Sequence, residues 1–136
     1  MIIKRINHLG IVPKDLNQTK KFFTEVLGLK EEGNEVVAEQ KVIVDFIRCD
    51  AARLELLSPT SEESPIAKFL ETRGAGIQHV ALEVDNLDNW IEYLKKNNIR
   101  LIDEKPRYGA HNTRIAFVHP HSTGGVLVEL VEEQSK

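Results

Sequence analysis

The pattern of apolar and polar positions begins with a strand and a helix. Residues 2–12 alternate and are rich in β-branched side chains, which predicts a strand that ends at Pro13. Asp15 is then a suitable helix N-cap, because its carboxylate can accept a hydrogen bond from the first helical turn. Apolar residues follow at helical spacing, and Gly28 is placed to end the helix in a left-handed conformation.

The same order of elements is predicted a second time, after a helical connector that runs from Ser64 to Gly74. Two or three strands are expected over 34–47 and 52–58, so the first half is β-α-β-β-β. The second half is predicted to have a strand at 77–84, a helix from an Asp85 cap to Asn97 and Asn98, and strands at about 99–103, 113–119 and 125–132. We therefore expect an α+β fold of two tandem βαβββ modules, about 2–60 and 75–133, within one domain that covers 1–136.

Short sequence motifs repeat along with the elements. "INHLGIV" around His8 and "IQHVALEV" around His79 are 71 residues apart, and the same offset relates Phe46 to Phe117. Late in each half, "RLELL" contains Glu55 and "VLVEL" contains Glu129, at an offset of 74. Each half therefore carries one histidine in its first strand and one glutamate in its last.

Two such halves, related by an approximate twofold axis, would bring His8, Glu55, His79 and Glu129 to one point. Imidazole nitrogen together with carboxylate oxygen suits Zn²⁺, Co²⁺, Mn²⁺, Ni²⁺ or Fe²⁺ better than Ca²⁺. We therefore predict one divalent metal ion per chain, with these four residues as ligands. Two simpler interpretations stay open: the histidines make a duplicated structural hydrogen bond, or the glutamates point to solvent from their strands.

The composition of the chain argues against a nucleic-acid-binding protein and against a membrane protein. The chain has 136 residues, of which 41% are hydrophobic and 29% charged, and its net charge is −3, so no basic face for nucleic acid is expected. No apolar run reaches the roughly 20 residues of a membrane helix, and no signal peptide is apparent at the start. The single Cys49 fits a reducing compartment. These features predict a cytoplasmic protein without nucleic-acid or membrane partners.

The duplicated module with an early histidine and a late glutamate resembles the vicinal oxygen chelate superfamily over essentially the whole chain. Within it, the connector "SPIAKFL" and the final "HP…GGVLVEL" resemble methylmalonyl-CoA epimerases most specifically. The resemblance places His8, His79 and Glu129 at metal-ligand positions, with Glu55 where a fourth ligand lies and where some members carry glutamine. It also implies an acyl-CoA substrate, a homodimer and a divalent metal such as Co²⁺, Mn²⁺, Ni²⁺ or Zn²⁺.

The resemblance implies epimerisation of (R)- and (S)-methylmalonyl-CoA by α-proton abstraction through a metal-stabilised enolate. Glu129 and Glu55 are the expected acid/base residues, because the proton must leave one face and return to the other. Some epimerases are thought to use a second glutamate on a central strand of the first half. Val44 appears at the matching place here, with Asp45 and Glu39 nearby.

Other functions remain in competition with the epimerase. A glyoxalase I-like lyase acting on a thiol hemithioacetal would use a similar donor set, and a ring-cleaving dioxygenase uses two histidines and a glutamate on Fe²⁺. A metal-free binding protein of the same fold is a further alternative. His111, His119 and His121 lie in or beside predicted loops and are weaker candidates for a functional role.

Overall fold

The computed structural model describes residues 1–134, which form two compact units. One unit comprises residues 8–78, and the other comprises residues 1–7 together with the chain from His79 onward. The first strand, β1 (Ile3–Val12), contributes its beginning to one unit and its end to the other. No helix among the described residues is long and apolar enough to cross a membrane.

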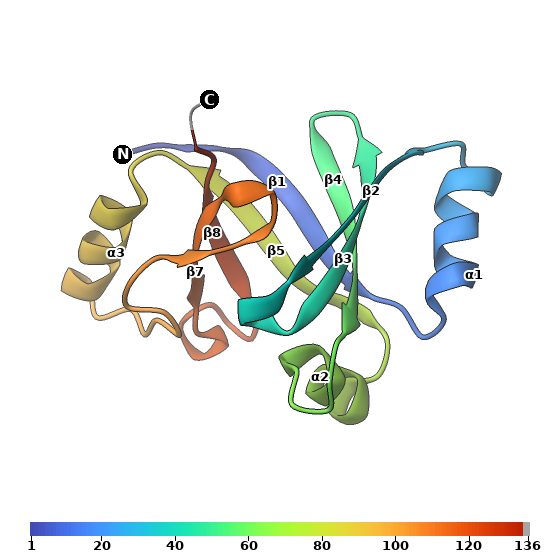
Figure 1. Cartoon of the computed structure of the whole chain (residues 1–136). Coiled ribbons are helices and arrows are strands. Elements are labelled where there is room, and N and C mark those ends of the chain that lie inside the picture. The colour runs from blue at the N-terminus through green and yellow to red at the C-terminus, as the bar shows by residue number, and fades with distance from the viewer. Residues whose placement is uncertain (135–136) are drawn as a thin grey trace. The chain divides into compact units, whose positions relative to one another are not determined.

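The unit of residues 8–78 contains a sheet in the strand order β2-β3-β4-β1, with α1 beside it (Figure 1). The pair β1–β4 is parallel, whereas β2–β3 and β3–β4 are antiparallel. Its elements are the end of β1, α1 (Leu16–Lys21) continuing into a π-helical turn (Phe22–Val26), β2 (Lys30–Val37), a 3₁₀ turn (Ala38–Gln40), β3 (Val42–Cys49), β4 (Ala52–Pro59) and α2 (Pro65–Arg73).

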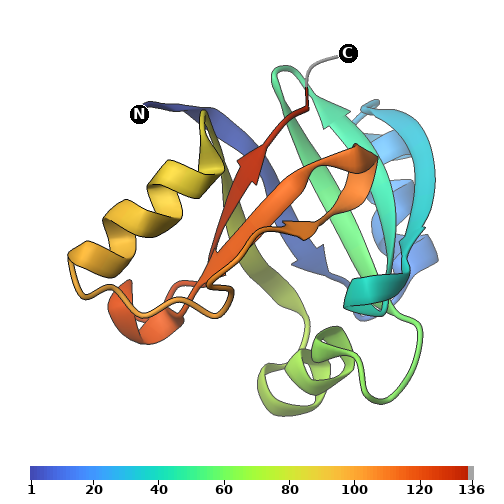
Figure 2. The same cartoon turned by 60° about the vertical axis from the view of Figure 1, so that its left-hand side comes forward.

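The other unit has the strand order β1-β5-β8-β7-β6, and α3 runs along this sheet (Figure 2). The pair β5–β8 is parallel, whereas β7 is antiparallel to both β6 and β8. Its elements are β5 (Gly76–Val84), α3 (Leu87–Lys96), β6 (Arg107–Tyr108), a turn at Ala110–Asn112, β7 (Arg114–Val118), a turn at Pro120–Ser122 and β8 (Val128–Glu132).

This order of elements confirms the α+β fold of two βαβββ halves. Two of the predicted helix starts are confirmed as well: the Asp15 carboxylate accepts a hydrogen bond from the Gln18 N–H, and the Ser64 hydroxyl accepts one from the Ile66 N–H. Both side chains satisfy backbone donors that the first helical turn leaves unpaired. The local sequence therefore set these helix starts.

The strand predicted at 99–103 is wrong. Leu101 makes only an isolated bridge to Val118, and the pairing strand β6 lies further along, at Arg107–Tyr108. Two of its apolar side chains, Ile99 and Leu101, instead pack against the cluster beneath α3. Alternating apolar residues mark burial, but a strand also needs a partner in register, which this segment finds at only one position.

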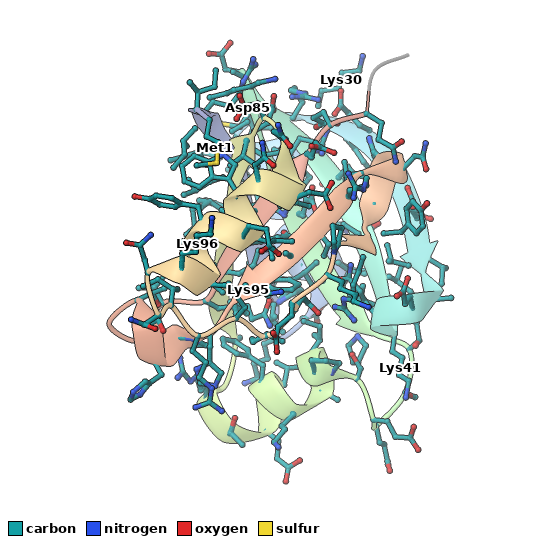
Figure 3. All side chains as sticks on the ribbon, turned by 90° about the vertical axis from the view of Figure 1, so that its left-hand side faces the viewer. Met1, Lys30, Lys41, Asp85, Lys95 and Lys96 are labelled. Atoms are coloured by element: carbon teal, nitrogen blue, oxygen red, sulfur yellow. The ribbon has the colours of Figure 1, made fainter. Side chains whose placement is uncertain are left out.

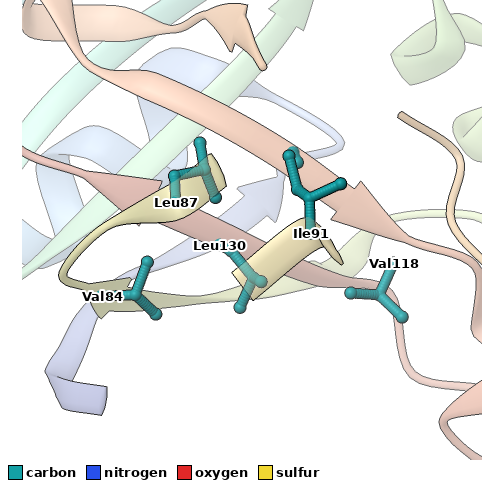
Figure 4. Close-up of a cluster of buried hydrophobic side chains, with 6 residues drawn as sticks. Val84, Leu87, Ile91, Val118 and Leu130 are labelled. Carbon is teal, nitrogen blue, oxygen red and sulfur yellow. The ribbon is translucent and has the colours of Figure 1, made fainter. Parts of the chain in front are cut away.

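The core beneath α3 holds the helix against its sheet. Buried side chains from β5, α3, β7 and β8 meet there, and Figure 4 shows most of them: Val84, Leu87, Ile91, Ala116, Val118 and Leu130. A second, smaller cluster of Ala81, Ile115 and Val131 belongs to the opposite face of the same strands. Both faces of this sheet are therefore apolar, and a polar side chain on either face needs a buried partner.

Asp85 does not cap α3, contrary to the prediction. The N-cap is Asn86, and the Leu87 N–H donates instead to Glu132 Oε2 at 2.7 Å. The Asp85 carboxylate turns to the start of the chain, where Oδ1 accepts from the Ile2 N–H at 2.7 Å and Oδ2 lies 4.0 Å from the Met1 amino nitrogen. Figure 3 shows Met1 and Asp85 side by side. Asp85 therefore binds the residues at the beginning of β1 to the end of β5.

We expect this attachment to weaken in acid. The backbone hydrogen bond from Ile2 lowers the pKa of Asp85 in the folded chain. A depressed carboxyl pKa contributes stability above the ordinary pKa, and that contribution disappears as the pH falls through the folded value. Asp85→Asn should therefore destabilise the protein near neutral pH, and the difference from the wild type should vanish in strong acid. Denaturant unfolding across the range from about pH 2 to about pH 7 measures this.

The control is Glu62→Gln, which removes an exposed carboxylate from the turn before α2. It should leave the pH profile of the wild type unchanged. A gap between the wild type and Asp85→Asn that persists unchanged into strong acid would contradict the role given to the Asp85 charge.

Candidate functional site

His8 and Glu55 form a buried pair in the unit of residues 8–78. Their strands, β1 and β4, run parallel, with Gly10 in register with Glu55, so the imidazole and the carboxylate lie on one face. His8 Nδ1 is 3.2 Å from Glu55 Oε2. Only 6% of His8 and 4% of Glu55 is exposed to solvent.

His79 and Glu129 form the equivalent pair in the other unit. Their strands, β5 and β8, are also parallel, and Ala81 is the residue in register with Glu129. His79 Nε2 is 3.1 Å from Glu129 Oε1, and both residues are 5% exposed. Small residues thus stand at corresponding places beside both glutamates, Gly10 in one half and Ala81 in the other.

A phenylalanine supports each pair at the same register. Phe46 on β3 pairs with Glu55, and Phe117 on β7 pairs with Glu129. The Phe117 ring packs edge-on against His79, with 5.6 Å between the ring centroids. The 71-residue offset seen in the sequence is therefore a repeat of strand register, and a phenylalanine occupies the same register position in both halves.

The burial of the glutamates rules out the interpretation in which they point to solvent from their strands. An ionised carboxylate in such surroundings is costly unless a cation or several hydrogen-bond donors face it. Within each half, one imidazole nitrogen and one carboxylate oxygen meet at hydrogen-bonding distance. A nitrogen and an oxygen donor held close together, away from bulk water, suit a first-row divalent ion. The donor chemistry of each half therefore fits half of a metal site.

Asp45 lies on the opposite face of β3 from Phe46, because neighbouring strand residues point to opposite sides. Its carboxylate accepts a hydrogen bond from Lys20 Nζ of α1 at 3.2 Å. A hydrogen bond to Glu31 raises the pKa of Lys20, and Asp45 adds to this effect. Asp45 is therefore an anchor for α1, whereas Glu39 lies in an exposed 3₁₀ turn.

The three weaker histidine candidates stand apart from the pairs. His111 lies in the turn before β7 with a left-handed backbone, and His119 and His121 flank the turn after it. Partial burial, with Arg100 and His121 nearby, lowers the pKa of His119. Its Nδ1 accepts the His121 N–H at 3.0 Å, which is a local turn-stabilising contact.

Arg53 is the residue of this site that the sequence reasoning missed. Its Nε donates to Glu55 Oε2 at 3.3 Å, and its guanidinium lies over the Phe46 ring, 5.5 Å from the centroid. The signal was present in "RLELL", where strand alternation places Arg53 on the same face as Glu55. Only 8% of this arginine is exposed, which is unusual for the residue type.

Comparison with known proteins adds independent information. The profile of the glyoxalase/bleomycin resistance protein/dioxygenase superfamily matches residues 7–117. The mitochondrial methylmalonyl-CoA epimerase of Bos taurus is 38% identical over 127 residues, which is 93% of this chain and 73% of that protein. The match to a curated relative thus extends over both halves.

Solved structures agree. The methylmalonyl-CoA epimerase of Mycobacterium tuberculosis superposes with a TM-score of 0.93 at 36% identity, over 98% of this chain and 90% of that one. A Streptomyces coelicolor methylmalonyl-CoA epimerase variant, in complex with 2-nitronate-propionyl-CoA, gives a TM-score of 0.93 at 32% identity, over 98% of this chain and 97% of that one. The chain therefore belongs to the glyoxalase/bleomycin resistance protein/dioxygenase superfamily and, within it, to the methylmalonyl-CoA epimerase family.

Proposed function

We propose that this protein is a metal-dependent epimerase that interconverts (R)- and (S)-methylmalonyl-CoA by removing and returning the α-proton. The observation that carries the proposal is the pair of buried histidine–glutamate contacts at equivalent register in the two halves. Family membership supports the choice of reaction, since both the curated relative and the solved structures bear this name. The S. coelicolor complex supports an acyl-CoA ester as the substrate class.

We propose that His8, Glu55, His79 and Glu129 hold one divalent ion, which is Co²⁺, Mn²⁺, Ni²⁺ or Zn²⁺. His8, His79 and Glu129 each offer one ligand atom of the kind such an ion takes. When bound, the ion would supply positive charge to the substrate oxygen on which negative charge develops. Because the donors come from both βαβββ halves, the proposal requires the halves to act together as one domain.

The residues of this chain would supply the proton transfers. Epimerisation needs a base on one side of the α-carbon and an acid on the other, and Glu129 and Glu55 come from opposite halves of the repeat. Both carboxylates are buried, which keeps bulk water from competing for the α-carbon. We assign Glu129 as the principal base, because a charged residue, Arg53, donates to Glu55 Oε2, whereas leucine stands at the corresponding position before Glu129.

Metal binding should depend on both halves. His8→Ala or His79→Ala removes a nitrogen donor, so the metal content per chain should fall sharply while the fold remains. His121→Ala is the matched control, because this exposed histidine lies outside both pairs. Elemental analysis of the purified proteins measures the metal, and circular dichroism checks the fold. Full metal content in both single variants would contradict a shared site.

The reaction is tested by proton NMR of methylmalonyl-CoA in D₂O. The purified protein should exchange the α-proton faster than the spontaneous reaction, a chelator should stop the exchange, and a divalent ion should restore it. A parallel assay with the hemithioacetal of methylglyoxal and glutathione tests the glyoxalase alternative. Turnover of the hemithioacetal without α-proton exchange would overturn the proposed function.

The two glutamates should respond differently to neutralisation. Glu129→Gln keeps the size and one oxygen ligand but removes the basicity, so α-proton exchange should fall by about 10²-fold or more. Glu55→Gln should retain exchange within about tenfold, about 1.4 kcal/mol on the barrier, for the epimer whose α-proton faces Glu129, and should slow exchange of the other epimer more. The same NMR assay measures both, at equal metal content. Equally mild effects would show that neither carboxylate is the base.

We also propose a cytoplasmic homodimer. A reducing location is supported by Cys49, which is a free and exposed thiol. Dimerisation is supported by the start of β1, where Ile2, Ile3 and Ile6 are each at least half exposed. Trp90 contributes less to such a surface, because it packs against the core under α3 and its indole N–H donates to Asp85.

Replacing Ile2 and Ile6, which share one face, together with serine should weaken this association, because it removes apolar area from the proposed interface. Light scattering at micromolar concentration should then give the mass of a dimer for the wild type and a smaller mass for the double variant. The control is Val26→Ser, which changes an exposed apolar residue of the π-helical turn after α1. A wild-type monomer would refute the proposal.

A further inference from the structure

The two histidine–glutamate pairs differ in one neighbouring residue. The residue two positions before Glu55 is Arg53, whereas the residue two positions before Glu129 is Leu127. Other features around the pairs match, including the phenylalanine in register with each glutamate. The fold of a half does not require a charged residue at this place, since the other half folds with leucine there. Arg53 therefore points to a task performed in the first half alone.

Arg53 is held in a defined place. It is in register with His8 on β1 and with Arg48 on β3, so it lies on the face that carries Glu55. The hydrogen bond to Glu55 holds the guanidinium at Nε. The Phe46 ring packs against one face of its plane. Only 10% of its side chain is exposed. The guanidinium is thus oriented before any ligand arrives.

The other edge of the guanidinium is open. Arginine has five N–H donors, and among residues 1–134 this arginine makes one hydrogen bond, through Nε. The two terminal amino groups make no hydrogen bond among these residues, and the exposed tenth of the side chain gives a small opening to solvent. Two parallel N–H groups at the end of a fixed guanidinium form the fork that binds a carboxylate through two hydrogen bonds.

Arg48 shows the contrast on the same face. It is the residue in register with Arg53 on the neighbouring strand, but its Nε and Nη2 are both 3.1 Å from Glu32 Oε1. Another of its amino groups donates to the Asp50 carbonyl. Its guanidinium is therefore occupied by protein acceptors. Arg53 is the better candidate for binding an anion from outside.

We propose that Arg53 is a substrate-binding residue that recognises the free carboxylate of a malonyl-type acyl group. This inference rests on the proposed function, and it identifies the free carboxylate as the group by which the site would distinguish its substrate from other acyl-CoA esters. Methylmalonyl-CoA carries such a carboxylate on the α-carbon, within a few bonds of the thioester. A guanidinium next to Glu55 would hold this carboxylate beside the proton-transfer residues. Acyl-CoA esters without the carboxylate would lack this contact.

Binding to two ligands that differ only in this group tests the proposal. Malonyl-CoA has a carboxylate where propionyl-CoA has a methyl group. Its α-carbon is not a stereocentre, so proton exchange regenerates the same ligand during the titration. Calorimetry should show that Arg53→Met lowers the affinity for malonyl-CoA by about tenfold or more, as expected for a lost charge-assisted hydrogen bond. Propionyl-CoA should keep its affinity within about twofold in the same variant.

Two further variants sharpen the test. Arg48→Met removes an arginine from the same face and should leave both affinities unchanged, because that side chain is bound to Glu32. Arg53→Lys keeps the charge but not the fork, so it should restore part of the preference for malonyl-CoA. Equal weakening of both ligands by Arg53→Met would assign the arginine to the phosphates of CoA and overturn the proposal. Unchanged binding of both would also overturn it.

The metal content of each variant separates ligand recognition from support of Glu55. Arg53→Met should retain its metal, and loss of metal would show that Arg53 serves only to hold Glu55, against the proposal. The wild type distinguishes this inference from the proposed function. Exchange of the α-proton without a preference for malonyl-CoA over propionyl-CoA would refute the inference alone. A preference that depends on Arg53, without any exchange, would refute the proposed reaction alone.

Discussion

Two carboxylates, Glu55 and Glu129, are buried in the interior of β-sheets, and much of the surrounding structure follows from what they require. Burying an ionised carboxylate is costly unless a donor or a cation faces it, so each one has a histidine within hydrogen-bonding distance. The parallel pairing of β1 with β4 and of β5 with β8 brings each histidine to its glutamate. A small residue, Gly10 or Ala81, is in register with each glutamate.

Polar residues on the other faces serve the fold. Lys20 reaches from α1 to the buried Asp45, and Glu132 on β8 accepts the first N–H of α3. Each of these contacts joins a helix to its sheet and satisfies a group that would otherwise be buried without a partner. Asp45 and Glu132 both lie on the faces of their strands that a helix covers. Glu55 and Glu129, which have histidine partners, lie on the opposite face of the sheet in their own unit.

The difference between the halves is as informative as their likeness. Duplication of a module produces two equivalent halves. The substrate of the proposed epimerisation is not symmetric, because its α-carbon carries a carboxylate and a thioester. Arg53 in one half and Leu127 in the other give the two sides different polarity. Arg53 also donates a hydrogen bond to Glu55. Leu127, at the corresponding position before Glu129, has no side-chain donor. Unequal roles for the two glutamates agree with this difference.

The sequence alone determined the repeat, the order of elements and the identity of the four histidine and glutamate residues. Periods of two and 3.6 residues fix which side chains share a face, and this information is local. The N-caps at Asp15 and Ser64 were predictable for the same reason, since the capping residue and its donor lie two or three positions apart.

Only the tertiary structure decided which partners meet across strands. Asp85 was a reasonable cap for α3 by position, yet its carboxylate binds the start of β1, and Glu132 supplies the Leu87 N–H from 45 residues away. Asp45 and Phe46 are neighbours in sequence but face α1 and Glu55, respectively. The strand predicted at 99–103 failed because pairing depends on a partner elsewhere in the chain. Spacing along the chain sets the phase of a strand, whereas its register against other strands depends on the packing of the whole sheet.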